Sequence, residues 1–187
     1  MINFNSKLDY CNSLYYKLPK SQLFRLQQIQ NSIARTVVKA SKSCHITPIL
    51  RSLHWLRITE RIEYKLLSLT YKVLTTTHQP PYRHNLISTQ RPRSTRSSSV
   101  VTLARPPSSF SLKITDHSFC YASPCLWNRL PLSLRKPHSG TRSFISYLPI
   151  PSPITFSSSD SPLCPSITPS LFHSRLKTYL FHKSYPP

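Results

Sequence analysis

The sequence predicts a mostly α-helical protein, built as a small, incomplete helical cluster with long disordered linkers. Two observations predict this class. Apolar residues recur at three- and four-residue steps in a few separate segments, which is the spacing of one helix face. Between those segments the chain is rich in serine, proline and arginine and has too little apolar surface to order its backbone.

Five helices are predicted, near residues 19–40, 48–54, 57–75, 124–130 and 171–182. In the first, Pro19 is a first-turn residue and an apolar stripe follows. The stripe consists of Leu23, Leu26, Ile29 or Gln30, Ile33 and Val37. In the second helix, Thr47 is a favoured N-cap and Pro48 stands at the favoured first position.

The third helix has the strongest pattern of the five. Its stripe is formed by Ile58, Ile62, Leu66, Leu69 and Val73, widened by Leu67 and Leu74. In the fourth helix, Ser123 is the expected cap, Pro124 the first residue and Pro131 the end. The fifth repeats apolar residues at Phe172, Leu176 and Leu180.

These patterns divide the chain into five regions. They are a helical region at 8–87, a basic linker at 88–118, a tryptophan-containing helix at 119–136, a disordered Ser/Pro-rich segment at 137–170 and an amphipathic helix at 171–183. The expected core residues are Leu26, Ile33, Trp55, Ile62, Leu66, Leu69 and Trp127. Such a core is small for the length of the chain, and its stability is expected to be marginal.

The charge of the chain predicts a polyanionic partner. Lys and Arg number 25 against 5 Asp and Glu, a formal net charge of +20. RNA or single-stranded DNA, bound without sequence preference, is the expected ligand. The candidate contacts are Arg25, Arg35, Lys39, Arg91, Arg93, Arg96, Arg129, Arg135, Lys136, Arg175 and Lys177. Tyr71, Tyr82 and Trp127 are candidates for base stacking, although Trp55 and Trp127 fit better as core residues.

No catalytic, cofactor or metal residues are predicted. With Gly140 as its one glycine, the chain has no Gly-rich phosphate-binding loop. Glu60 and Glu63 lie one turn apart and Arg57 lies one turn from Glu60, so an exposed pairing on the helix face is expected for them. The cysteines lack zinc-finger spacing and are expected to be reduced. With no leader and no membrane-spanning run, an intracellular location, cytoplasmic or nuclear, is expected.

Several phrases in one order carry a resemblance to a known family. They are LDYCNSLYYKLP (8–19), RLQQIQNSIAR (25–35), HITPILRSLHWL (45–56), RIEYKLLSLTYKVL (61–74), RSTRSSS (93–99), SPCLWNRLPLSLR (123–135) and FHSRLKTYLF (172–181). Together they resemble the region after the polymerase domain in LINE-type, non-LTR retrotransposon reverse transcriptases. The resemblance implies a parent polyprotein whose endonuclease and polymerase parts are absent here. What it carries over is association with element RNA or target DNA, and with the missing polymerase domain as a partner.

Two departures from the family pattern indicate drift. Residues 144–170 are additional Ser/Pro-rich sequence, and TDHSF (115–119) replaces the family's Gly-x-Arg-Ala-Phe phrase. A non-catalytic C-terminal fragment with at most non-specific nucleic-acid affinity is the main hypothesis. Two alternatives stay open: a helical protein-interaction module that docks acidic partners through residues 22–38 and 57–74, and a translated retroelement remnant without function.

Overall fold

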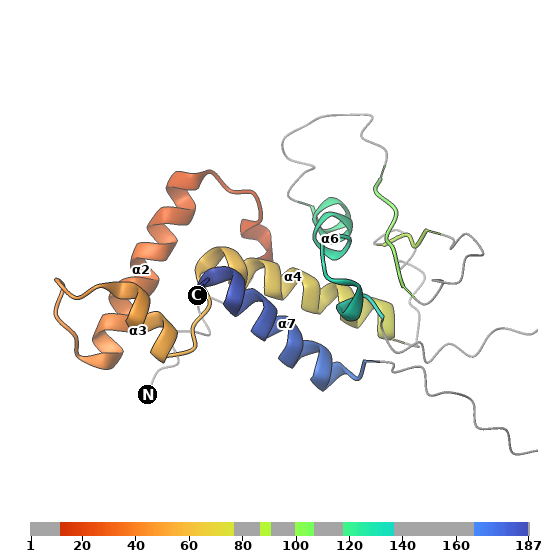
Figure 1. Cartoon of the computed structure of the whole chain (residues 1–187). Helices are drawn as coiled ribbons and strands as arrows, with labels where there is room; N and C mark the ends of the chain where they lie inside the picture. Colours follow the sequence, from red (N-terminus) through yellow and green to blue (C-terminus); the bar gives the residue numbers. More distant parts are fainter. Residues whose placement is uncertain (1–11, 77–86, 91–99, 107–117, 137–166, 187) are drawn as a thin grey trace, which may run out of the picture.

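The structure, a computed structural model, describes residues 12–76, 87–90, 100–106, 118–136 and 167–186, and this part of the chain is mostly helical, as predicted (Figure 1). Its α-helices are α2 (Lys20–Val38), α3 (Ile46–Ser52), α4 (Ile58–Thr75), α6 (Phe119–Trp127) and α7 (Pro169–Ser184). Two short 3-10 helices, η1 (Asn12–Tyr15) and η3 (Leu132–Leu134), accompany them. Most of the predicted linkers, at 91–99, 107–117 and 137–166, lie outside the described residues.

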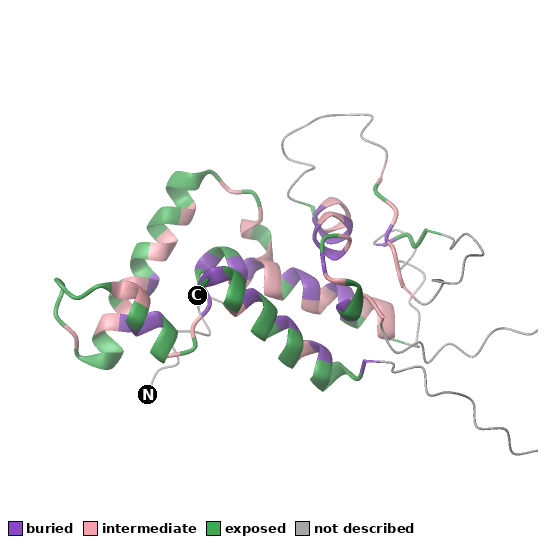
Figure 2. Cartoon of the chain, in the orientation of Figure 1, coloured by how far each residue is buried: buried purple, intermediate pink, exposed green. Residues whose placement is uncertain are grey.

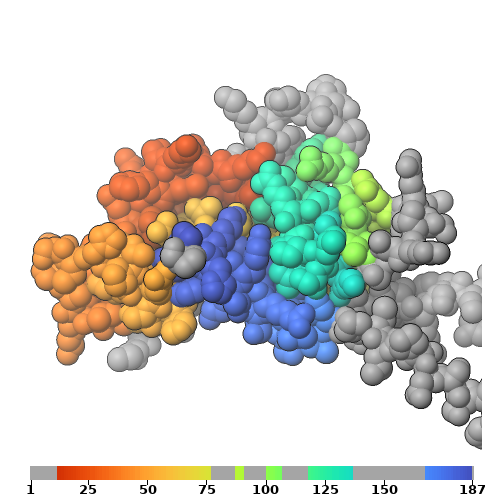
Figure 3. Space-filling view, in the orientation of Figure 1, coloured from red at the N-terminus to blue at the C-terminus, as the bar shows by residue number. Residues whose placement is uncertain are grey.

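Helix α4 is the centre of the cluster. It lies against α2, α6, α7 and η1, and α3 packs on α2. Figure 1 shows α7 running alongside α4, and Figure 3 shows α7 with α3 and α6 near its two ends. This arrangement buries much of α4, whereas the outer faces of α2 and α7 stay exposed (Figure 2).

The main core joins segments that are distant in sequence. It is formed by Leu56, Ile58, Ile62, Leu66, Leu67, Tyr71, Ile87, Leu103, Ala122, Leu126, Trp127, Leu130, Leu134, Ile167, Phe172, Leu176 and Leu180. A smaller cluster of Ala34, Ile49, Leu50 and Tyr185 lies between α2, α3 and the end of α7. The apolar face of α7 is fully covered, because Phe172, Leu176 and Leu180 are all 0% exposed.

The expected core residues fall into two groups. Ile62, Leu66 and Trp127 are buried in the main core. Leu26 packs against the main core and Trp55 against the smaller cluster, both while partly exposed. Ile33 and Leu69 are also partly exposed. On α2 the inward position belongs to Gln30, while Ile29 and Val37 face solvent.

Two helices begin earlier than the prolines predicted. Helix α3 starts at Ile46 with His45 as its N-cap, so Pro48 is the third helical residue. A proline there costs no hydrogen bond, because the N–H groups of the first turn have no intrahelical partner. Helix α6 starts at Phe119 with Ser118 as its N-cap, which places Pro124 inside the helix.

Packing explains why α6 extends in front of Pro124. Ala122 and Ser123 are both 0% exposed, and these small residues lie where α6 meets α4. The hydroxyls of Ser123 and Thr70 are hydrogen-bonded at 2.7 Å across that junction. Burial of this first part of the helix therefore offsets the backbone hydrogen bond that Pro124 removes.

Within the described residues, three turns use a left-handed backbone without glycine. Lys17, Lys39 and His54 have φ of 59°, 56° and 54°. After Lys39 the N–H of Ala40 donates to the Arg35 carbonyl, and after His54 the N–H of Trp55 donates to the Leu50 carbonyl, both at 2.9 Å. These hydrogen bonds end α2 and α3 next to a left-handed residue, a position at which glycine is usual. The left-handed backbone costs about 1 kcal/mol for each residue that has a Cβ atom.

The predicted basic linker at 88–118 is ordered in part, which corrects the expectation of disorder there. Thr89 and Leu103 form an antiparallel bridge, with the Ala104 N–H donating to the Ser88 carbonyl at 2.7 Å. Ile87 and Leu103 are buried in the main core. The local composition did not predict this order, because the partners that stabilise it come from α6.

Those partners are Trp127 and Asn128 at the end of α6. The Trp127 Nε1–H donates to the Val101 carbonyl at 2.9 Å. The Asn128 amide accepts from the Leu103 N–H at 3.0 Å and donates to the Leu103 carbonyl at 2.9 Å. The Asn128 side chain thus pairs with the Leu103 backbone as a neighbouring strand would. Trp127, which is 0% exposed, holds the end of α6 against the same segment.

Candidate nucleic-acid interface

The basic residues predicted to contact nucleic acid are spread over several surfaces. Arg25 and Lys39 are exposed on or beside α2, and Arg175 and Lys177 are exposed on α7. Arg129 is exposed after α6, whereas Arg135 and Lys136 are partly covered. Arg35 is also partly covered, and its guanidinium donates to the Cys44 carbonyl at 3.4 Å. Arg91, Arg93 and Arg96 lie outside the described residues.

Two of the aromatic candidates for base stacking are inaccessible. Tyr71 is 1% exposed and its hydroxyl donates to the Ile167 carbonyl at 2.6 Å. The Tyr71 ring stacks on the Phe172 ring, with 4.0 Å between the two centroids. The centroid of the Trp127 ring lies 6.0 Å from that of Phe172. Both rings therefore belong to the core and cannot receive a base. Tyr82 lies outside the described residues.

The expected exposed pairing of Glu60 and Glu63 on the helix face, with Arg57 one turn from Glu60, is wrong. Glu63 instead binds Lys183 of α7 at 2.6 Å. Glu60 is buried, and burial raises the pKa of its carboxyl above the ordinary value. The Arg57 guanidinium lies 5.3 Å from the centre of the Tyr185 ring. Packing of α7 on α4 separates these partners, which the pattern of α4 alone does not indicate.

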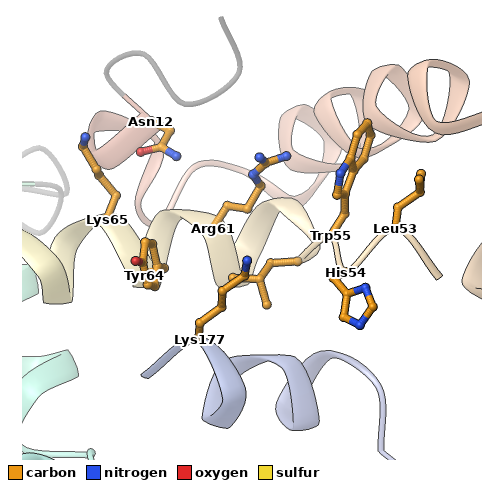
Figure 4. A pocket seen from close by; sticks show the side chains of 9 residues that line it. Asn12, Leu53, His54, Trp55, Arg61, Tyr64, Lys65 and Lys177 are labelled. Carbon is orange, nitrogen blue, oxygen red and sulfur yellow. The ribbon is translucent and has the colours of Figure 1, made fainter. Parts of the chain in front are cut away.

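One cavity brings basic and aromatic side chains together. It has a volume of about 420 Å³ and lies between η1, the α3–α4 connection, α4 and α7. Its described lining is Asn12, Leu53, His54, Trp55, Leu56, Arg61, Tyr64, Lys65 and Lys177. Figure 4 shows Lys177 reaching from α7 toward α4, and Lys65 pointing toward Asn12.

The α4 residues of this cavity share one helix face. Arg61, Tyr64 and Lys65 stand three and four positions apart, so their side chains project in the same direction. The Tyr64 hydroxyl also lies 3.4 Å from Nδ1 of His173 on α7. Helix α4 therefore buries Ile62 and Leu66 on one side and presents two cations on another.

Trp55 reaches the cavity because of the turn that ends α3. The left-handed His54 reverses the chain, and its imidazole stacks on Phe181 at 5.9 Å. The Trp55 carbonyl accepts from the Tyr185 hydroxyl at 2.8 Å, which fixes the backbone on the α7 side. On the α2 side, the Gln30 amide donates to the Leu56 carbonyl at 2.8 Å.

Sequence reasoning included Lys177 in the interface but missed Arg61, Lys65 and Tyr64. Their i, i+3, i+4 spacing opposite the apolar stripe was visible, but that spacing is typical of any solvated helix face. What distinguishes them is the approach of Lys177 from α7, more than a hundred positions along the chain. A pattern within one helix contains no information about that approach.

None of the titratable groups with a shifted pKa belongs to the described lining of this cavity. Burial beside Cys125 raises the pKa of Tyr16 to about 12. Burial also raises the pKa of Tyr71 and Tyr185 above the ordinary tyrosine value. Each shift results from packing of a side chain into the cluster. In the described part of the chain, no three His, Cys, Asp or Glu residues are grouped so that they could hold a metal ion.

Three comparisons with known proteins give no match. No family model, no curated protein and no solved structure matches it. Within the described residues, no helix combines the length and apolar character that crossing a bilayer requires.

Proposed function

We propose that the protein is a non-catalytic, basic nucleic-acid-binding module that corresponds to the region after the polymerase of a LINE-type reverse transcriptase. It binds RNA or single-stranded DNA without sequence preference, in the cytoplasm or nucleus. The net charge of +20 is the observation that carries the proposal. So large an excess repels itself in a compact chain and is relieved by a polyanion, through release of the counterions that surround phosphates.

Exposed cations on several helices support this mode of binding. Arg25, Lys39, Arg129, Arg175 and Lys177 lie on different surfaces of the cluster. Such a distribution favours contact with a flexible single strand, which follows a curved surface, over contact with a rigid groove. It also favours phosphate contacts, which carry no sequence information.

The test is binding of a fluorescently labelled single-stranded RNA of about 20 nucleotides, measured by anisotropy across a salt series. If about six phosphates are neutralised, the logarithm of the association constant should fall with the logarithm of salt concentration with a slope of roughly −4. An unlabelled DNA strand of unrelated sequence should compete about equally well. Absent or salt-insensitive binding would overturn the proposal.

Protein docking through α2 is the second candidate function. Phe24, Ile29, Val37 and Val38 are 63%, 50%, 56% and 46% exposed, which is unusual for large apolar side chains of one helix. The helix near 57–74, the other helix of this hypothesis, is α4. It is packed against α2, α6, α7 and η1 and is therefore less available to a partner. Partners that remain bound to the protein after nuclease treatment would favour this candidate over nucleic-acid binding.

A further inference from the structure

The 420 Å³ cavity described above carries an inference that rests on the proposed function and makes it specific. Its described lining contains three cations, Arg61, Lys65 and Lys177, and none of these lining residues is acidic. The volume lies within the range of small-ligand pockets. A concave site lined by several positive charges favours an anion.

The acidic residues of α4 do not neutralise these cations. Glu63 is bound to Lys183 through both carboxylate oxygens, at 2.7 and 2.6 Å. Glu60 is 9% exposed and is not among the residues that line the cavity. Because successive residues of a helix are rotated by about 100°, the cations Arg61 and Lys65 lie about 100–160° around α4 from Glu60 and Glu63. The α4 carboxylates are therefore held outside the cavity.

The cavity also offers a flat aromatic surface. Trp55 lines it and is only partly buried, unlike Trp127. Figure 4 shows the Trp55 side chain rising from the α3–α4 connection on the side toward which Arg61 extends, while Lys177 reaches α4 from the opposite side. An indole near cations matches the two parts of a nucleotide, since bases stack on aromatic rings and phosphates bind cations.

We propose that this cavity binds one phosphorylated nucleotide of a single strand, with the phosphate among Arg61, Lys65 and Lys177 and the base against Trp55. The ligand class follows from the joint requirement for a dianion or phosphodiester and a planar ring. A base within a duplex is stacked and paired, so it cannot enter. The cavity therefore gives the module a preference for single-stranded over double-stranded nucleic acid.

Two double variants isolate the cavity from the general charge of the chain. Lys65→Ala with Lys177→Ala removes two exposed cations of the cavity. Arg25→Ala with Lys39→Ala removes the same charge from exposed positions on and beside α2, and it is the matched control. All four side chains are exposed, so both variants are expected to keep the far-ultraviolet circular dichroism of the parent.

The probe is adenosine 5′-monophosphate, titrated by calorimetry into the full-length chain and into both variants. The parent and the matched control should bind it saturably, and the cavity variant should bind it about tenfold or more weakly, because hydrogen bonds to charged groups are lost. Adenosine and inorganic phosphate should each bind more weakly than the nucleotide. Equal binding to both variants, or binding of phosphate alone as tight as that of the nucleotide, would overturn the inference.

Parallel measurements separate this inference from the proposed function. The labelled RNA is bound to the same three proteins, with an unlabelled duplex and an unlabelled DNA strand as competitors. RNA binding that is salt-dependent but equal in both variants, and equally displaced by duplex, overturns the cavity site and leaves the general function standing. Failure of the RNA to bind the parent at any salt concentration overturns the proposed function.

Discussion

Buried polar side chains decide several features at the scale of single residues. Gln30 is 0% exposed because its amide donates to the Leu56 carbonyl and its oxygen accepts from Gln27 at 2.9 Å. Gln27 in turn accepts from the Ile58 N–H at 3.0 Å, at the first turn of α4. Two glutamines of α2 thus satisfy backbone groups at the entrance to α4, which an apolar residue would leave unpaired.

Glu60 leads to a prediction about pH. Burial raises the pKa of its carboxyl above the ordinary value of 4.5, so the folded chain holds this proton more tightly than the unfolded chain. The free energy of unfolding therefore falls as the pH rises from about 4.5, because the folded state must then hold a buried negative charge. Glu60→Gln should be more stable than the parent at pH 7 and nearly equal to it at pH 4. Urea unfolding followed by circular dichroism at both pH values measures this.

Glu63→Gln is the control for that measurement. It removes the bond to Lys183, which is 46% exposed, so its effect at pH 7 should be a loss of at most about 1 kcal/mol. The two variants differ from the parent by the same change of charge, and their effects at pH 7 should have opposite signs. A Glu60→Gln protein less stable than the parent at pH 7 would show that this carboxylate is stabilised by its neighbours.

At the scale of elements, Asn128 stabilises the segment 100–106 against α6. Asn128→Ala removes the two hydrogen bonds to Leu103 and leaves partly buried backbone groups unpaired, which should cost about 1–3 kcal/mol of unfolding free energy. Amide hydrogen exchange should quicken at residues 101–104 more than in α4. Asn128→Asp keeps the acceptor for the Leu103 N–H but sets a carboxylate oxygen against the Leu103 carbonyl, so it should also lose stability. Unchanged exchange in this segment would contradict the role given to Asn128.

Helix periodicity predicted where helices form but not which residues they bury. The α4 pattern located Ile62 and Leu66 in the core because apolar burial repeats every three or four residues. It did not locate Thr70 or Glu60, since those are buried by α6 and α7, which arrive from distant parts of the chain. The order of residues 100–106 was missed for the same reason.

The sides of the candidate cavity also differ in whether a pattern within one helix or packing between distant helices forms them. Its α4 side is readable as the i, i+3, i+4 set of Arg61, Tyr64 and Lys65. Its Trp55 side depends on a left-handed His54, and this backbone conformation is uncommon outside glycine even though histidine adopts it more often than most residues. Its third side, Lys177, depends on how α7 docks. Composition predicted the positive charge of the chain but not which cations line the cavity.

At the scale of the whole molecule, the net charge of +20 acts on folding and on binding in opposite directions. Within the folded chain the cations repel one another, and salt screens this repulsion, with a Debye length that falls from about 10 Å at 0.1 M to about 3 Å at 1 M. Sodium chloride should therefore raise the midpoint of thermal unfolding. The same salt should weaken binding to RNA, because counterion release then contributes less.

Thermal unfolding and RNA anisotropy, measured in the same sodium chloride series, test this opposition. Arg25→Ala with Lys39→Ala lowers the net charge at exposed positions, so it should unfold at a higher temperature than the parent in low salt. The difference should shrink as salt rises, since screening then replaces the effect of the substitutions. A midpoint of thermal unfolding that falls with salt would mean that local ion pairs, such as Lys183 with Glu63, outweigh the general repulsion. Relief of that repulsion by a polyanion would then be contradicted.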